Sequence, residues 1–363
     1  MKNVGTRSAN RVGGRRRDRP RACFAPLIIL QLIFLLLVSP IVSLADQPVA
    51  ETAQEQVEEQ SEPAETENLL DRGKQSVDTQ AQRAARWVDS FFTDPNYEAE
   101  VASSQFRIRP ELHYREEQGA KARLKFSLKV RLPSIERRVS IVAGNDGEDG
   151  NFGDSVDDNA EDSVVGLQFF GKKRKSWHTS LSVGMKFNDF AFFLGPRVSY
   201  FKSLGDKSSY QFTQTLRYQT NNYWQVNSRL DLNHSFSERY FFRQTFDGRW
   251  RGEKSDEEGY RTRISSLLTR RLKNAAGLQY NFTTIFHTRP DTHVDRYTLS
   301  VRYRKRTRRE WLYYEIVPEV SFEDEFDYKA NPGIRLRVEV FFGADRVKEF
   351  WRREHEDTED FRW

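Results

Sequence analysis

Residues 333–342 read GIRLRVEVFF, in which apolar and charged side chains alternate almost one for one. Side-chain direction in a β-strand has period two, so this segment has one apolar face and one charged face. The apolar face holds Ile334, Leu336, Val338 and Val340, and the charged face holds Arg335, Arg337 and Glu339. Two-faced segments recur along residues 105–342, with arginine repeatedly on the polar face. The pattern predicts an all-β fold, a transmembrane antiparallel up-and-down β-barrel with an apolar exterior and a wet, charged lumen.

The same segment contains a short motif, in which a polar residue and a glycine precede two spaced apolar residues and a final aromatic residue. Its members are Asn331, Gly333, Leu336, Val338 and Phe342. The order resembles the terminal-strand signal of bacterial outer-membrane β-barrels, a porin-like class, and identifies no specific family within it. The resemblance implies that the barrel-assembly machinery recognises this strand. In that class the aromatic residue usually ends the chain, whereas here residues 343–363 follow, which we expect to form a charged periplasmic C-terminal tail.

The first 45 residues have the layout of a secretory signal peptide. A basic stretch precedes an apolar run over residues 24–43, and the small residues Ser43 and Ala45 suit cleavage before Asp46. The alternative is an uncleaved inner-membrane anchor, because a run of about 20 apolar residues can span a bilayer. We favour the signal peptide, since Gln31 and Pro40 interrupt the run. A signal peptide predicts export from the cytoplasm, and the resemblance to outer-membrane barrels implies that the destination is the envelope of a Gram-negative bacterium.

Charge and cysteine content limit the partners. Residues 1–45 carry eight basic and one acidic side chain, so the remaining chain has a net charge of −2 instead of +5, and nucleic-acid binding gains no support. The single cysteine, Cys23, would leave with the signal peptide. With six histidines and no mature cysteine, we expect no transition-metal site and no cofactor.

Two segments precede the barrel. Residues 46–78 hold ten acidic side chains and no aromatic one, which predicts a disordered acidic periplasmic tether. Residues 79–104 include an apolar stripe at helical spacing, which predicts a short helix. That stripe contains Trp87, Val88, Phe91 and Phe92. The helix either docks on the barrel rim, the interpretation we favour, or plugs the barrel mouth.

Residues 105–342 divide into about fourteen alternating segments, with twelve to sixteen strands allowed, each near the length that a tilted strand needs to cross a bilayer. We expect them to begin near Gln105, Ala122, Arg137, Val164, Trp177, Phe190, Ser209, Tyr223, Arg239, Tyr260, Ala275, Arg296, Trp311 and Ile334. If both termini are periplasmic, the long connections at residues 144–163, 251–259, 288–295 and 323–333 all fall on the extracellular side.

The predicted inward face is rich in arginine and poor in acids, which favours a lumen that attracts anions. The cations nearest to the closure of the barrel are Arg107, Arg109, Arg123, Lys125, Arg302, Arg304, Arg335 and Arg337. Guanidinium groups bind carboxylate or phosphate in a bidentate manner. The competing interpretation is that inward charges only solvate one another and water in a closed barrel.

Two further sets of residues are weaker candidates. The loop over residues 144–163 offers oxygen ligands for Ca²⁺, but it lacks the spacing of a known calcium loop and we favour a solvated acidic loop. Its candidate ligands are Asp146, Glu148, Asp154 and Asp157. His178 with Ser180, and His234, are the only candidates for catalysis, and we favour structural roles for them.

The sequence thus predicts an integral outer-membrane protein with periplasmic termini, and not an enzyme. Its expected function is a passive channel that favours anionic small solutes. The first alternative is a closed barrel with a structural or envelope-interaction role, and the second is an outer-membrane lipid-modifying or proteolytic enzyme. Expected partners are outer-membrane lipid, lipopolysaccharide and the barrel-assembly machinery, with no nucleic acid.

Overall fold

The computed structural model describes residues 80–92, 105–131, 139–145, 163–171, 176–187, 190–221, 223–309 and 311–342. The predicted signal peptide, acidic tether and C-terminal tail lie outside the described residues. So does the acidic loop with its four candidate calcium ligands, Asp146, Glu148, Asp154 and Asp157.

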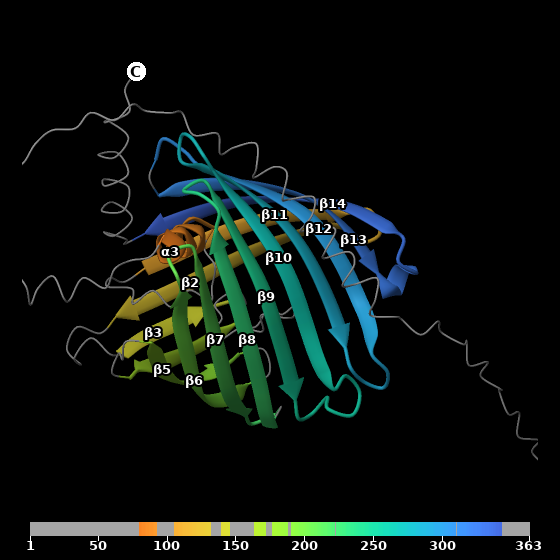
Figure 1. The fold of residues 1–363 in the computed structure, drawn as a ribbon. Helices are drawn as coiled ribbons and strands as arrows, with labels where there is room; N and C mark the ends of the chain where they lie inside the picture. Colours follow the sequence, from red (N-terminus) through yellow and green to blue (C-terminus); the bar gives the residue numbers. More distant parts are fainter. Residues whose placement is uncertain are drawn as a thin grey trace, which may run out of the picture.

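Fourteen strands form a closed barrel in which every strand pairs antiparallel with its neighbours in the chain (Figure 1). The strands are β1 (Gln105–Arg115), β2 (Gly119–Arg131), β3 (Val139–Gly144), β4 (Val164–Phe170), β5 (Trp177–Lys186), β6 (Ala191–Leu204), β7 (Ser208–Gln219), β8 (Tyr223–Ser235), β9 (Tyr240–Arg251), β10 (Tyr260–Leu272), β11 (Ala276–His287), β12 (His293–Arg306), β13 (Leu312–Glu323) and β14 (Ala330–Phe342). The predicted fold and strand number are confirmed.

Three strands begin three or four residues earlier than the alternating pattern predicts. β2 begins at Gly119, because Gly119, Ala120 and Lys121 already pair with β1. β12 begins at His293, because His293 and Val294 pair with β11 before a register shift between Ile285 and Phe286. β14 begins at Ala330, because the residues before Gly333 already pair with β13. The connections expected over residues 288–295 and 323–333 therefore shorten to residues 288–292 and 324–329, and the latter includes the short helix η1 (Asp324–Phe326).

The two faces of each strand differ as the alternation predicts. On the terminal strand, the Leu336 and Val338 side chains are 41% and 42% exposed on the outside. On the inside, Arg337 is 3% exposed, and Arg109 of the neighbouring strand is 2% exposed. Large apolar side chains are likewise exposed on the outer faces of most of the remaining strands. An exterior of this kind requires lipid around it, so the barrel spans a membrane.

The barrel closes where β1 meets β14. Phe106 is paired with Phe342, and their rings stack with centroids 5.8 Å apart. A Cβ atom at Gly333 would lie 2.8 Å from the carbonyl oxygen of Tyr114 on β1, closer than such contacts occur. Glycine at this position thus has a steric reason, because any side chain would push β14 away from β1. The role of the motif in assembly stays a prediction.

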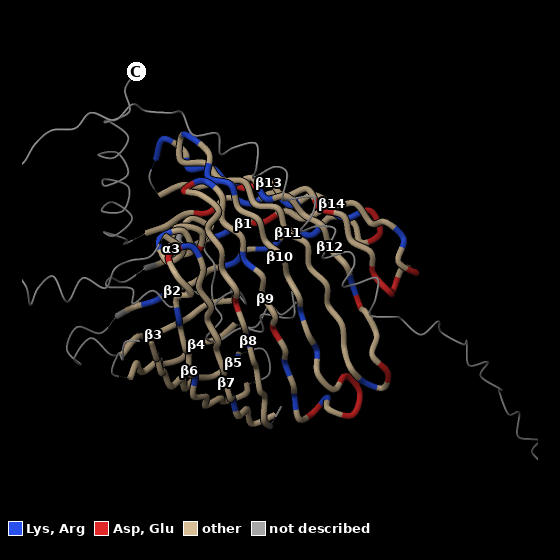
Figure 2. The backbone as a smooth tube through the Cα atoms, viewed as in Figure 1, with Lys and Arg blue, Asp and Glu red and all other residues tan. Residues whose placement is uncertain are grey.

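The two ends of the barrel differ in charge (Figure 2). We call the end where the chain enters β1 and leaves β14 the terminal end, and the opposite end the loop end. Acidic residues gather in the loop-end connections after β9 and β13. Basic residues gather at the terminal end of β10 to β13, including Arg270, Lys273, Arg308 and Arg309. One α-helix, α3 (Gln80–Phe92), lies at the terminal end. Among the described residues, no helix is long and apolar enough to cross a bilayer.

Candidate functional site: the charged lumen

The eight cations predicted to attract anions occupy inward positions on four strands. Arg107 and Arg109 belong to β1, Arg123 and Lys125 to β2, Arg302 and Arg304 to β12, and Arg335 and Arg337 to β14. Since β1 pairs with both β2 and β14, the structure brings these residues together on one wall of the lumen. The strand between β12 and β14 is β13. Its inward face carries Glu315, Glu319 and Glu323 and no Lys or Arg.

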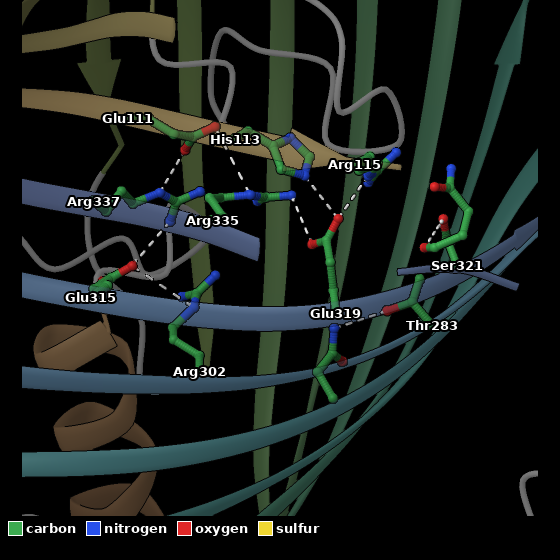
Figure 3. Close-up of polar contacts among 12 residues, drawn as sticks. Glu111, His113, Arg115, Thr283, Arg302, Glu315, Glu319, Ser321, Arg335 and Arg337 are labelled. Carbon is green, nitrogen blue, oxygen red and sulfur yellow. Dashed lines mark hydrogen bonds and ion pairs between the residues drawn. The ribbon is translucent and has the colours of Figure 1, made fainter. Parts of the chain in front are cut away.

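The most deeply buried part of this wall is centred on Arg304. Its Nη1 forms ion pairs with both Glu315 and Glu339, and all three side chains are 1–2% exposed. Arg337 Nη1 donates to Glu315 Oε2 at 3.2 Å, and Arg337 Nε donates to Glu111 Oε2 at 2.6 Å (Figure 3). One chain of ion pairs therefore ties β1, β12, β13 and β14 together.

The chain of ion pairs continues toward the loop end through Glu319. Arg335 Nη2 donates to Glu319 Oε2 at 3.2 Å, and Arg115 Nε donates to Glu319 Oε1 at 2.7 Å. His113 Nε2 also lies 2.9 Å from Glu319 Oε1 (Figure 3). Arg115 Nη1 then donates to Glu323 Oε1 at 3.1 Å. We call Glu111, Glu315, Glu319, Glu323 and Glu339 the glutamate ladder.

Most of the predicted cations are ion-paired with the glutamate ladder and are not free charges in the lumen. Its five glutamates form ion pairs with seven arginines: Arg107, Arg109, Arg115, Arg302, Arg304, Arg335 and Arg337. The sequence identified most of the members but not their pairing. The wall stays positive on balance, while its arginines are held in fixed positions. A lumen lined in this way presents oriented guanidinium groups instead of mobile ones.

The opposite wall, formed by β6 to β10, is also basic. Its inward positions carry Arg197, Arg217, Arg229, Arg243, Arg249, Arg261 and Arg263. The inward aspartates of these strands are Asp231 and Asp247. Arg229 Nε donates to Asp231 Oδ2 at 2.7 Å. Positive charge therefore lies on two opposite walls of the lumen and is not confined to the wall near the barrel closure.

Helix α3 lies inside the terminal mouth of the barrel. Its first backbone N–H groups are capped by Asp206 in the turn between β6 and β7, where Gln80 N donates to Oδ1 at 3.2 Å and Ala81 N to the carbonyl oxygen at 3.0 Å. Its aromatic side chains pack across the mouth against Phe241 of β9 and Tyr313 of β13. Of the two interpretations that the sequence left open, these contacts agree with the plug.

Two further features fix α3 in place. Asp89 of the helix accepts from Arg243 of β9 at 2.6 Å and 3.0 Å, while Arg243 Nε donates to Asn233 at 2.8 Å. Gly277 of β11 leaves room for the helix, because a Cβ there would lie 2.7 Å from Phe92 and 2.8 Å from Phe91. A buried, bidentate ion pair and a steric recess thus hold the helix in the mouth.

The residues considered for catalysis have other surroundings. Ser180 points inward and accepts from Gln168 at 3.5 Å. His234 Nδ1 lies 2.8 Å from Ser208 Oγ on the outer face, and its ring packs edge-on against Phe236. No carboxylate within the described ranges is hydrogen-bonded to His234, so the third member of a triad is missing there. In the described part of the chain, no group of three His, Cys, Asp or Glu side chains could hold a metal ion.

No protein-family model matches the chain, and no curated protein matches it. Solved structures are similar at low identity. The KdgM porin in complex with disordered oligogalacturonate has a TM-score of 0.34 and 8% identity, covering 66% of this chain and 99% of that one. The anion-selective porin from Comamonas acidovorans has a TM-score of 0.40 and 7% identity, covering 66% of this chain and 98% of that one. A loop deletion mutant of OmpT, an outer-membrane protein of Vibrio cholerae, has a TM-score of 0.43 and 8% identity, covering 66% of this chain and 98% of that one.

At these TM-scores and identities the likeness carries no argument about what the lumen binds. The closed antiparallel barrel, its exposed apolar exterior and its charged interior are those of a porin-like outer-membrane β-barrel. Any functional inference rests on this chain's own residues.

Proposed function

We propose that the protein is a passive outer-membrane channel that favours small anionic solutes and is closed at its terminal end by α3. The observation that carries the proposal is the excess of arginine over carboxylate on the inward faces of both walls. A fourteen-strand barrel encloses more space than an eight-strand one, whose interior side chains alone can fill. Positive charge lining a low-dielectric wall raises the local concentration of anions and opposes the entry of cations.

The glutamate ladder supports this function because it holds the lumen arginines in fixed orientations. An arginine that is already held by a glutamate loses little side-chain entropy when an anion contacts its remaining N–H groups. Solutes with a carboxylate or phosphate group suit such donors, because two parallel N–H···O bonds match their geometry. The ladder also limits the repulsion among the inward cations that would otherwise destabilise the barrel.

Removing positive charge from the lumen should weaken the preference for anions. Arg123 and Lys125 of β2 suit this test, because both are inward and less buried than Arg109 or Arg304. We expect the double variant Arg123→Gln and Lys125→Gln to fold and to shift the reversal potential in a salt gradient toward cation permeation.

The matched control removes two cations from the outer face. Lys202 and Arg270 are exposed and lie on the apolar side of β6 and β10. The double variant Lys202→Gln and Arg270→Gln should keep the reversal potential of the unchanged protein. An equal shift in both double variants would show that selectivity does not arise in the lumen.

The second candidate function is a closed barrel with a structural or envelope-interaction role. The observation that favours it is α3, which fills the terminal mouth and buries its aromatic side chains there. The two candidates differ in one measurable respect. A channel conducts once α3 is removed, whereas a closed barrel stays silent in a planar bilayer with or without the helix.

We also propose that the terminal end faces the periplasm, so that the acidic loop end faces outward among lipopolysaccharide. The barrel-assembly machinery would then meet β14 from the periplasmic side. A tag inserted after Asp256, in the connection between β9 and β10, should be labelled on intact cells. Labelling only after the outer membrane is permeabilised would reverse the orientation.

A further inference from the structure

Basic residues gather at the terminal end of the barrel, in two turns and on the outer face of β12 (Figure 2). We call Lys273, Lys305, Arg308 and Arg309 the terminal basic patch. Lys273 lies in the turn after β10, and Arg308 and Arg309 lie in the turn after β12. The strands that carry these turns are joined there, because Arg306 N donates to the carbonyl oxygen of Ala275 at 3.0 Å. The four cations therefore form one region of the surface.

The terminal basic patch is accessible and lies at the depth of lipid headgroups. Its three turn residues are exposed. Lys305 is half-buried and points outward, because it is directly opposite the outward Tyr314 and follows the inward Arg304. The Arg309 guanidinium lies 5.4 Å from the ring centroid of Trp311, which is itself exposed. Tryptophan and tyrosine at strand ends mark the boundary between membrane and water, so these cations lie beside lipid headgroups.

The described part of the chain does not neutralise the patch. None of its four residues forms an ion pair with a described carboxylate. Over the terminal halves of β10 to β13 the outer face carries no Asp or Glu. In the two turns the sequence has one acidic residue, Glu310, which lies outside the described residues. The loop end differs, because Lys254 pairs with Glu258 at 3.7 Å and Arg289 pairs with Asp256 at 3.4 Å.

The lipid around the barrel can supply the missing negative charge. Phosphate oxygens accept hydrogen bonds from guanidinium and ammonium groups, and basic residues beside a bilayer attract anionic lipids. A zwitterionic lipid suits the patch less well, because its own cation lies next to its phosphate. The outer face continues from the patch toward the middle of the barrel with Leu299 and Ile316, which are 44% and 40% exposed. The same lipid molecule can therefore place its phosphate on the patch and its acyl chains on the apolar strands.

We propose that the terminal basic patch binds the phosphate group of an anionic phospholipid in the inner leaflet of the outer membrane. The choice of leaflet rests on the proposed orientation, in which the terminal end faces the periplasm. The binding itself depends on the charge, exposure and depth of the patch, and not on whether the lumen conducts. It distinguishes the two ends of the barrel, because the cations of the patch are held by lipid and those of the loop end by carboxylates of the chain.

Native mass spectrometry tests the proposal. The purified protein is placed in vesicles of equal parts phosphatidylcholine and phosphatidylglycerol, extracted in a nonionic detergent, and weighed with the lipid that it retains. We expect phosphatidylglycerol to be retained in excess. Each basic residue near a membrane surface contributes about a fivefold gain in the binding of anionic lipid, so Lys305→Gln with Arg309→Gln should reduce the excess by roughly 25-fold. Lys305→Arg with Arg309→Lys keeps the charge and should keep the excess.

The matched control removes two cations from the loop end. Lys254→Gln with Arg289→Gln should keep the excess of phosphatidylglycerol, because carboxylates already pair with both residues. The proposal is overturned if the unchanged protein retains both lipids equally, or if both double variants lose the excess equally. An excess that arises only after deletion of residues 46–78 would assign the patch to that acidic segment instead. Labelling of the tag after Asp256 only in permeabilised cells would overturn the choice of phospholipid in favour of lipopolysaccharide phosphate.

Discussion

Deleting residues 80–92 should convert the barrel from a poorly conducting protein into an open channel. The helix fills the terminal mouth with Trp87, Phe91 and Phe92, and it is anchored there by Asp89 and Arg243. Without it the lumen communicates with solvent at both ends. In a planar bilayer we expect the single-channel current to rise from near the baseline to well-resolved steps.

A single substitution that weakens the docking of α3 should also raise the conductance. Asp89→Asn leaves Arg243 without its charged partner in the docked state, and breaking a buried ion pair in this way costs about 3–5 kcal/mol. The ratio of docked to undocked helix would fall by a factor of roughly a hundred or more, because each 1.4 kcal/mol is about tenfold. The control is Arg83→Gln on the exposed face of the same helix, which should leave the conductance unchanged. If the variant that lacks residues 80–92 carries no current, the closed-barrel function is favoured over the channel.

The second large effect concerns stability. Glu339→Gln should destabilise the barrel by about 3–5 kcal/mol, because Arg304 is 1% exposed and would lose one of its two carboxylate partners in the interior. The expected readout is a lower midpoint of urea unfolding in lipid vesicles, with an unchanged slope.

The matched control is Glu258→Gln at the loop end. Glu258 pairs with Arg251 at 3.4 Å and is 28% exposed, so its ion pair is screened by water and the substitution should cost less than about 1 kcal/mol. If the two variants unfold at the same midpoint, the buried ion pairs of the glutamate ladder do not stabilise the barrel more than an exposed ion pair does.

The barrel itself was predictable from residues such as those at 333–342. In a closed barrel in lipid most outward side chains are apolar, and period two then fixes the register of each strand. Asn331 and Pro332 lay beyond the alternating residues, so their pairing with β13 was missed. The start of β12 was missed because the bulge between Ile285 and Phe286 breaks the period.

The site was only partly predictable. The inward direction of Arg304 and Arg337 follows from strand parity, but their partners do not. Arg337 meets Glu111 from 226 positions away because the barrel closes between β1 and β14, and this contact depends on the stagger of strands that no local pattern records. Likewise, the apolar helical stripe favoured docking on the rim over a plug, but the stripe does not record which residues the helix contacts. The recess at Gly277, against which Phe91 and Phe92 lie, is far along the chain from the helix.

The central claim is that the arginines of the lumen favour the passage of anions. Its most direct test is the reversal potential of the protein lacking α3 in a potassium chloride gradient at low salt. We predict a reversal potential with the sign of the chloride equilibrium potential. Its magnitude should shrink as ionic strength rises, because the screening length falls from about 30 Å at 0.01 M to about 3 Å at 1 M. A reversal potential with the sign of the potassium equilibrium potential would contradict the account.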